Sequence, residues 1–129
     1  MARIVVCEDD PVIMKLIQVS LRDPGYELLP AANGIVGLEL IERERPDAIL
    51  TDVSMPGLNG LELADAVRAQ PELAQIPILF LTASAQRTQL EEGLRHGATA
   101  YITKPFRTAE LRSALAWALE QSRPSPDGR

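Results

Sequence analysis

The sequence predicts an α/β domain built on a doubly wound sheet of five parallel strands. Short apolar runs alternate with segments in which apolar residues recur at helical spacing, and the connections between them are short. One run, residues 78–81, is entirely apolar and needs cover on both of its faces. Together these observations favour right-handed crossovers that place helices on both sides of one parallel sheet.

The first strand and helix occupy the start of the chain. Residues 3–7 are the run RIVVC, which predicts a buried strand, and residues 11–22 predict a helix. Asp10 followed by Pro11 is typical of an N-cap and a proline at the first helical position, so we assign Asp10 mainly to the helix start. The stripe expected to face the core from this helix is Ile13, Leu16, Ile17 and Leu21.

The second and third pairs repeat this order after a break at residues 23–25, DPG. Residues 27–31 and 48–51 predict strands, and residues 33–45 and 59–70 predict helices. The side chains expected to point inward from these helices are Leu38, Ile41, Leu61, Ala64 and Val67.

The last two pairs have strands at 78–81 and 99–103, a turn at 82–84, and helices at 86–96 and 107–121. The last helix carries a full inward stripe of Leu111, Ala114, Leu115, Ala118 and Leu119.

The fourth helix differs from the others because its inward stripe is thin. It offers mainly Leu90 and Leu94, so we expect it to be weakly anchored to the sheet and able to move. His96 before Gly97 is typical of a helix C-terminus, where a cation suits the dipole and glycine suits the cap. Trp117 in the last helix is open to two interpretations, a core residue or a partner surface.

Length and composition limit the possible functions. The 129 residues suffice for one domain, which we place at 1–121, followed by a flexible tail or truncated linker at 122–129. A net charge of -5 disfavours direct binding to nucleic acid or to an anionic membrane. No stretch approaches the roughly 20 apolar residues that span a bilayer, and the amino terminus has no signal-peptide pattern. We therefore expect a cytoplasmic protein. Cys7 lies within the apolar run IVVC, so we expect its side chain to be buried rather than reactive.

Polar residues of complementary kinds follow four of the five predicted strands. They are Glu8 and Asp9, Asp52, Thr82 and Lys104. The carboxyl ends of parallel strands share one edge, where ligands bind in such sheets. Three acids gathered there repel, since one like-charge pair at 4 Å costs about 4 kcal/mol at an effective dielectric near 20. Lys104 supplies one positive charge, and a hard cation such as Mg²⁺ would supply the rest.

Each of these residues also has an ordinary structural explanation when it is taken singly. Asp52 could cap the turn that follows its strand, Thr82 could be a turn residue, and Lys104 could be a solvated amine. Tyr101 could be a strand aromatic that simply packs. Their joint occurrence at the strand ends is what capping alone would not require.

Four segments carry a family resemblance over nearly the whole chain. They are IVVCEDDP (4–11), DAILTDVSMPGLNG (47–60), ILFLTAS (78–84) and GATAYITKPF (97–106). On these motifs the chain resembles the receiver domain of two-component response regulators. The resemblance implies a flavodoxin-like (βα)5 fold with strand order 2-1-3-4-5, and a phosphoprotein that serves in phosphorelay signal transduction.

The resemblance also implies a metal site beside the phospho-acceptor. Asp52 resembles the phospho-accepting aspartate. Asp9 and Asp52 resemble direct ligands of Mg²⁺, together with the backbone carbonyl of Ser54, while Glu8 would act mostly through metal-bound water. Many members of the family have Asp where this chain has Glu8, and the longer side chain should still serve that role.

A second group of residues resembles the phosphoryl-binding and switch positions. The Thr82 hydroxyl and the Ala83 backbone N–H match groups that bind the phosphoryl oxygens, and Lys104 matches the lysine that pairs with them. The Lys104–Pro105 peptide bond would be cis. Thr82 and Tyr101 match the two switch residues of the family.

The function implied is that of a phospho-acceptor rather than an enzyme, although the domain assists its own phosphorylation and dephosphorylation. A histidine kinase or a histidine phosphotransfer protein would donate the phosphoryl group. The surface formed by residues 86–96, 99–103 and 107–121 would then change and signal to a protein partner. Since no output segment follows Gln121, the output would come from that partner or from a domain outside this sequence.

Two other classes remain open. A small phosphohydrolase could use the same aspartate, but it would want a substrate pocket and a second general acid beside Asp52, which Val53 and Ser54 do not supply. A pseudo-receiver could bind protein without phosphorylation. Thr99 and Ala100 stand where DNA-binding members that dimerise often carry an acidic pair, which weakens the case for such a dimer.

Overall fold

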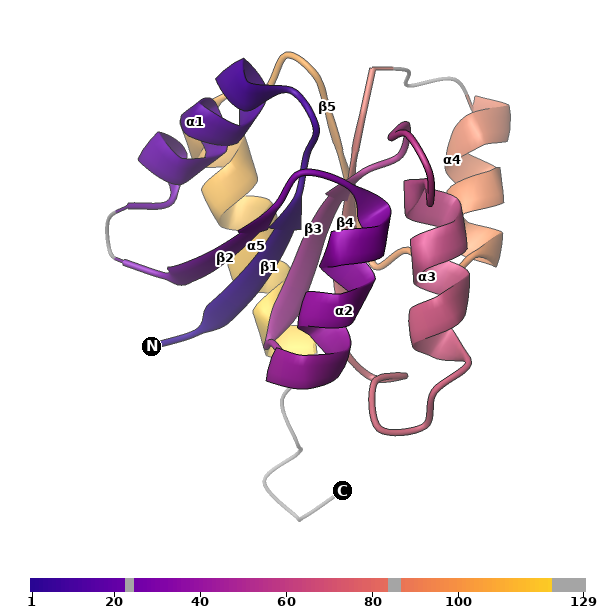
Figure 1. Cartoon of the computed structure of the whole chain (residues 1–129). Coiled ribbons are helices and arrows are strands. Elements are labelled where there is room, and N and C mark those ends of the chain that lie inside the picture. The colour runs from indigo at the N-terminus through magenta and orange to yellow at the C-terminus, as the bar shows by residue number, and fades with distance from the viewer. Residues whose placement is uncertain (23–24, 84–86, 122–129) are drawn as a thin grey trace.

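The computed structural model describes residues 1–22, 25–83 and 87–121, and for 87–90 it describes the backbone alone. Strands and helices alternate throughout this part of the chain, as predicted (Figure 1). The strands are β1 (Arg3–Cys7), β2 (Glu27–Ala31), β3 (Ala48–Asp52), β4 (Ile78–Thr82) and β5 (Ala100–Thr103). The helices are α1 (Pro11–Ser20), α2 (Gly34–Glu44), α3 (Gly60–Arg68), α4 (Arg87–Arg95) and α5 (Thr108–Gln121).

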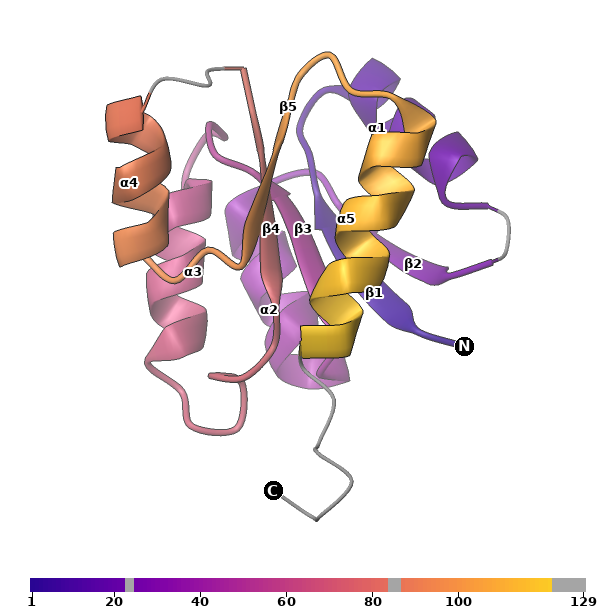
Figure 2. The same ribbon diagram turned by 180° about the vertical axis from the view of Figure 1, so that it is seen from behind.

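The five strands form one parallel sheet in the order β2-β1-β3-β4-β5. Helices α1 and α5 cover one face, while α2 and α3 cover the other and α4 lies beside α3 (Figures 1 and 2). This arrangement confirms the predicted doubly wound, flavodoxin-like fold. The order places β1 and β3 side by side at the centre, with Cys7 in register with Thr51, so their carboxyl ends are neighbours.

Two apolar layers hold the sheet between its helices. One layer joins β1, β3 and β4 to α1 and α5 through side chains that include Ile4, Leu50, Ile17 and Leu115. The other joins the opposite face of these strands to α2 and α3 through side chains that include Val5, Ile49, Ile41 and Leu63. Every residue of β3 and β4 is buried, because successive side chains point into opposite layers.

Cys7 belongs to the second layer, as predicted. Its side chain is fully buried, and burial raises the pKa of the thiol to about 12, so the thiolate does not form at neutral pH.

Polar side chains define where the helices begin. Asp10 caps α1 by accepting hydrogen bonds from the backbone N–H of Val12 at 2.8 Å and of Ile13 at 3.4 Å, which confirms its predicted role. Asn59 and Glu62 form a reciprocal capping box at the start of α3. These caps fix the starts of α1 and α3, the two helices that follow the acids at the ends of β1 and β3.

Two of the side chains that were predicted to face the core do not, so these predictions were wrong. Leu16 is 43% exposed, because α1 packs on the sheet through Ile17 and Leu21 and directs Leu16 away from it. Leu94 is 58% exposed, because the residue of α4 that contacts the sheet at this level is its neighbour Gly93. Leu90 was also predicted to face the core, and its side chain is outside those that the structure describes.

Four further predictions fall wholly or partly outside the described residues. They are the break at 23–25, the last position of the turn at 82–84, the first position of the helix at 86–96 and the tail at 122–129. Along the residues that are described, no helix combines the length and apolar character needed to cross a membrane.

Candidate functional site

The backbone of the sheet places the predicted site residues at one edge. Glu8 continues the pairing of β1 with β2, since its N–H donates to the carbonyl oxygen of Ala31 at 3.0 Å. Asp52 is the last residue of β3, and the N–H of Lys104 donates to the carbonyl oxygen of Thr82 at 2.8 Å. The side chains of these residues therefore start from fixed positions on adjacent strand ends.

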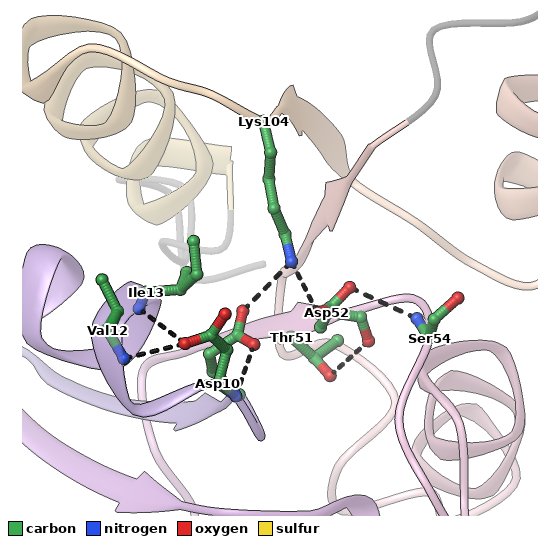
Figure 3. A network of polar contacts seen from close by, with 8 residues as sticks. Asp10, Val12, Ile13, Thr51, Asp52, Ser54 and Lys104 are labelled. Atoms are coloured by element: carbon green, nitrogen blue, oxygen red, sulfur yellow. Dashed lines mark hydrogen bonds and ion pairs between the residues drawn. The ribbon is translucent and has the colours of Figure 1, made fainter.

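Lys104 and Asp52 form the central ion pair of this site. The Lys104 Nζ lies 2.6 Å from Asp52 Oδ2 (Figure 3). It also lies 3.4 Å from Glu8 Oε1. Burial lowers the pKa of Lys104, but its hydrogen bond with Asp52 and the charges of Asp52 and Glu8 outweigh this, so the pKa is raised overall. The ammonium is thus held in its charged form between two carboxylates.

Three carboxylates crowd around that single ammonium. Glu8, Asp9 and Asp52 each offer an oxygen, and these oxygens lie within 4.8 Å of one another. Asp9 is exposed, whereas Glu8 and Asp52 are buried. Within the described part of the chain, this is the group of acidic side chains whose spacing suits a metal ion.

Glu8 shows most directly that the site suits a cation. Its Oε2 accepts a hydrogen bond from the backbone N–H of Asp10 at 3.0 Å, but its buried Oε1 has no hydrogen-bond partner. Lys104 approaches that oxygen only at ion-pair distance. Burial raises the pKa of Glu8, the Asp10 N–H opposes the shift, and the charge of Asp52 adds to it. Hard oxygen donors and surplus negative charge are what Mg²⁺ favours, so these residues fit that ion.

A cavity of about 400 Å³ lies next to the ion pair. Asp52, Thr82, Ala83 and Lys104 line one part of it, and the N–H of Ser54 donates to Asp52 Oδ1 at 3.3 Å. Thr82 is buried and Ala83 is exposed. The cavity gives a small anion room to reach a carboxylate, a hydroxyl and an ammonium at once.

Two aromatic side chains line another part of the cavity. Tyr101 lines it together with Phe80, and the two rings meet edge to face with their centroids 5.9 Å apart. Burial raises the pKa of the Tyr101 phenol, the backbone of Leu94 opposes the shift, and the charge of Glu92 adds to it. Tyr101 therefore links the cavity to α4.

The predicted residues lie at this edge, apart from Tyr101, which is in register with Phe80 within the sheet and lines the adjoining cavity. The side chains of Glu8, Asp9, Asp52 and Lys104 are in mutual contact or close to it, and the other predicted residues line the adjoining cavity. The Lys104–Pro105 peptide bond is cis.

Sequence reasoning missed three interactions that hold α4 and its neighbours. Gly93 contacts Tyr101, His96 Nδ1 lies 2.7 Å from Asp65 Oδ1 of α3, and Arg68 of α3 bonds to several loop carbonyl oxygens. No local pattern indicated any of them, because each joins residues from different elements.

Arg68 is half-buried beneath the loops at the far end of the sheet. Its Nη1 donates to the carbonyl oxygens of Ala74 at 2.8 Å and Ile76 at 2.7 Å, and its Nη2 donates to that of Gly97 at 2.7 Å. Burial lowers the pKa of the guanidinium. One side chain thus joins the loop before β4 to the turn after α4.

The doubly wound fold, with an acidic, lysine-containing pocket at the carboxyl edge of its sheet, is the fold of receiver domains. Residues 4–116 match the response regulator receiver domain, and the chain belongs to that family.

Individual relatives agree with the assignment. The chain is 38% identical to protein PilH of Pseudomonas aeruginosa over 105 residues, covering 81% of this chain and 87% of PilH. It is 33% identical to chemotaxis protein CheY-3 of Vibrio cholerae over 114 residues, covering 88% of each. Other relatives are longer. The match to the DNA-binding regulator RpaA of Synechocystis, at 34% identity, covers 95% of this chain but 51% of RpaA.

Solved structures give the same result. The chemotaxis protein CheY4 of Vibrio cholerae has a TM-score of 0.86 at 35% identity, with 92% of this chain and 98% of that chain covered. The receiver domain of the sensor histidine kinase PA1611 from Pseudomonas aeruginosa has a TM-score of 0.85 at 37% identity, with the same coverage. In that structure a magnesium ion is coordinated in the active site cleft.

Proposed function

We propose that this domain accepts a phosphoryl group on Asp52 from a phosphohistidine of a histidine kinase or phosphotransfer protein. The observation that carries the proposal is the position of Asp52, which is buried at the end of β3 with the Lys104 ammonium 2.6 Å away and two further carboxylates close by. Phosphoryl transfer depends mainly on positioning and charge stabilisation, and this site supplies both.

The chemistry assigns a separate task to each residue. An Asp52 carboxylate oxygen attacks phosphorus, the P–N bond of the donor breaks, and its electron pair returns to the imidazole nitrogen, which then takes a proton from water. Lys104 moves from the carboxylate to the phosphoryl oxygens, while the Thr82 hydroxyl and the Ala83 N–H donate to the others.

Mg²⁺, when bound by Asp9, Asp52 and the Ser54 carbonyl with Glu8 acting through water, would neutralise charge on the transferring group. The PA1611 receiver domain offers a precedent for such an ion in a related fold.

The switch would follow from the added charge. A phosphoryl group carries roughly -1.5 to -2 charges, by analogy with other phosphorylated side chains. We infer that it draws the Thr82 hydroxyl inward, that Tyr101 responds within the shared cavity, and that the surface of α4, β5 and α5 changes. A protein partner, or an output domain outside this sequence, would bind the changed surface. We place this domain at 1–121 and expect it to act in the cytoplasm, without binding nucleic acid or membrane.

Intact mass spectrometry after incubation with acetyl phosphate and Mg²⁺ tests the proposal. The wild type should gain the mass of one phosphoryl group, and Asp52→Asn should not. Asp65→Asn is the matched control, because Asp65 is an exposed acid on α3 outside the site, and it should label like the wild type.

Three outcomes would contradict the proposal. Labelling of Asp52→Asn would place the acceptor elsewhere. An unlabelled wild type would favour a pseudo-receiver, and repeated turnover of small phosphoesters would favour a phosphohydrolase.

A further inference from the structure

Several buried glycines of the helices lie in close contact with their surroundings, and at Gly60 and Gly93 the contacts differ in kind. A Cβ on Gly60 would lie 2.3 Å from the backbone carbonyl oxygen of Asp52, which cannot withdraw without moving β3. A Cβ on Gly93 would lie 1.8 Å from the phenol oxygen of Tyr101 and 2.7 Å from its ring carbon Cζ. The second neighbour is the tip of a side chain, which can rotate away while the backbone stays in place.

Because Gly93 has no Cβ, the surface of α4 has space at this position for the Tyr101 phenol. Gly93 is buried, whereas its neighbour Leu94 points to solvent, so this space is confined to one position of the helix. On its other side the Tyr101 ring contacts Phe80 edge to face. Both Gly93 and Tyr101 line the cavity that also contains Asp52. The ring is thus held between a strand and a helix at the wall of the phospho-acceptor cavity.

We propose that Gly93 is a positioning residue that sets the resting place of Tyr101 and thereby couples α4 to the state of Asp52. This inference rests on the proposed function, and it assigns the control of the switch to a residue with no side chain. Tyr101 lies on β5, the edge strand of the described sheet, and is already partly exposed, so a ring displaced from α4 can turn toward solvent. A methyl group at position 93 should therefore turn Tyr101 outward and leave the helix backbone intact.

The test is a spectrophotometric pH titration of the phenol in unphosphorylated protein. Tyr26→Phe makes Tyr101 the only tyrosine, so the signal is unambiguous. In this background Gly93→Ala should bring the phenol pKa down from its raised position toward the ordinary value. It should also abolish the nuclear Overhauser contacts between the Tyr101 and Phe80 rings. Arg95→Ala changes an exposed residue of the same helix and should alter neither readout.

The proposal is overturned if Gly93→Ala leaves the phenol pKa and the ring contacts unchanged, or if the pKa rises because the ring moves deeper. If that variant loses its folded amide spectrum, the clash is borne by the backbone and the proposal also fails. Gly93→Ser should give the same outward shift, because its Cβ meets the same atoms. None of these measurements needs a phosphoryl group, so failure of Asp52 to label would count against the proposed function alone.

Discussion

The two ends of the sheet carry ion-pair networks of opposite character. At the amino end, the Arg3 guanidinium contacts Glu44 and lies 3.4 Å from Glu27, and Arg43 lies 3.1 Å from Glu44. These side chains are between 29% and 66% exposed, and two cations face two anions.

At the carboxyl end, three carboxylates face the Lys104 ammonium, and the side chains of Glu8 and Asp52 are 0% and 9% exposed. The balanced network is solvated, whereas in the unbalanced one Glu8 and Asp52 are buried and Asp9 alone is exposed. Burial of surplus negative charge costs stability, so its presence at one end of the sheet indicates a site that is completed by a cation. We infer from this difference that the ion pairs at the amino end serve cohesion and that those at the carboxyl end belong to the proposed phospho-acceptor site.

The largest expected effect comes from removing the ammonium at the carboxyl end. Lys104→Met should lower the free energy of unfolding by about 2 kcal/mol without Mg²⁺, somewhat less than for a fully buried pair, because buried carboxylates lose their counter-charge. Addition of Mg²⁺ should recover part of this loss. Urea unfolding with and without Mg²⁺ measures both effects.

Lys15→Met is the matched control, since Lys15 is exposed on α1. Equal losses of stability in the two variants would show that the Lys104 ammonium contributes no more than an exposed lysine. That result would contradict the contrast between the two ends of the sheet.

A smaller effect of opposite sign is expected from removing one surplus acid. Glu8→Gln should raise the free energy of unfolding without Mg²⁺ by about 1 kcal/mol, because it removes a buried charge with an unpartnered oxygen. It should also reduce the stabilisation that saturating Mg²⁺ confers on the wild type. Thermal unfolding at several Mg²⁺ concentrations tests both statements. A destabilised variant with an unchanged Mg²⁺ response would show that Glu8 supports the fold rather than the ion.

The pH dependence of stability gives a further test of the same carboxyl group. The folded state raises the pKa of Glu8 above its ordinary value of 4.5, so between these two values the folded protein binds more protons than the unfolded chain. Stability without Mg²⁺ should therefore fall as the pH rises through this window. The urea midpoint of Glu8→Gln should not show this fall. The difference in stability between the variant and the wild type should therefore grow as the pH rises. Parallel pH profiles for the two proteins would contradict the assignment.

The smallest effect is expected at the amino end. Arg3→Gln removes the contacts with Glu27 and Glu44, but these groups are solvated, so the loss of stability should be well below that of Lys104→Met. The loss should also shrink further as the salt concentration rises. Urea unfolding in low and high salt measures this, with labelling of Asp52 unaffected. A large, salt-independent loss would show that the amino end is as tightly coupled as the site.

Much of this architecture could be read from the chain because its causes are local. The run at β4 is apolar up to Thr82, and the run at β3 is apolar apart from Thr51 and ends at Asp52, so both the buried strands and the polar edge follow from sequence order. Parallel pairing then requires the acids and Lys104 to converge. Asp10 could be assigned to a helix start because capping depends on residues within one turn.

What could not be predicted depends on how each helix is rotated about its own axis. Leu16 and Leu94 satisfy the helical spacing, yet they point outward because packing against distant residues selects a different face. The contact of Gly93 with Tyr101 requires the position of α4 relative to β5, which no local pattern contains. The unpartnered oxygen of Glu8 likewise appears only when three strand ends are assembled.

The contacts of Arg68 limit how the neighbouring helix α4 can move. By joining the loop before β4 to Gly97, Arg68 fixes the point at which α4 ends, and the contact of His96 with Asp65 reinforces that point. A helix of nine residues is about 13 Å long, at 1.5 Å per residue. If α4 tilts about its fastened end, displacement grows with distance from the pivot and is greatest at Arg87. A small angular change would thus be amplified along the helix into its largest excursion at the end farthest from Gly97.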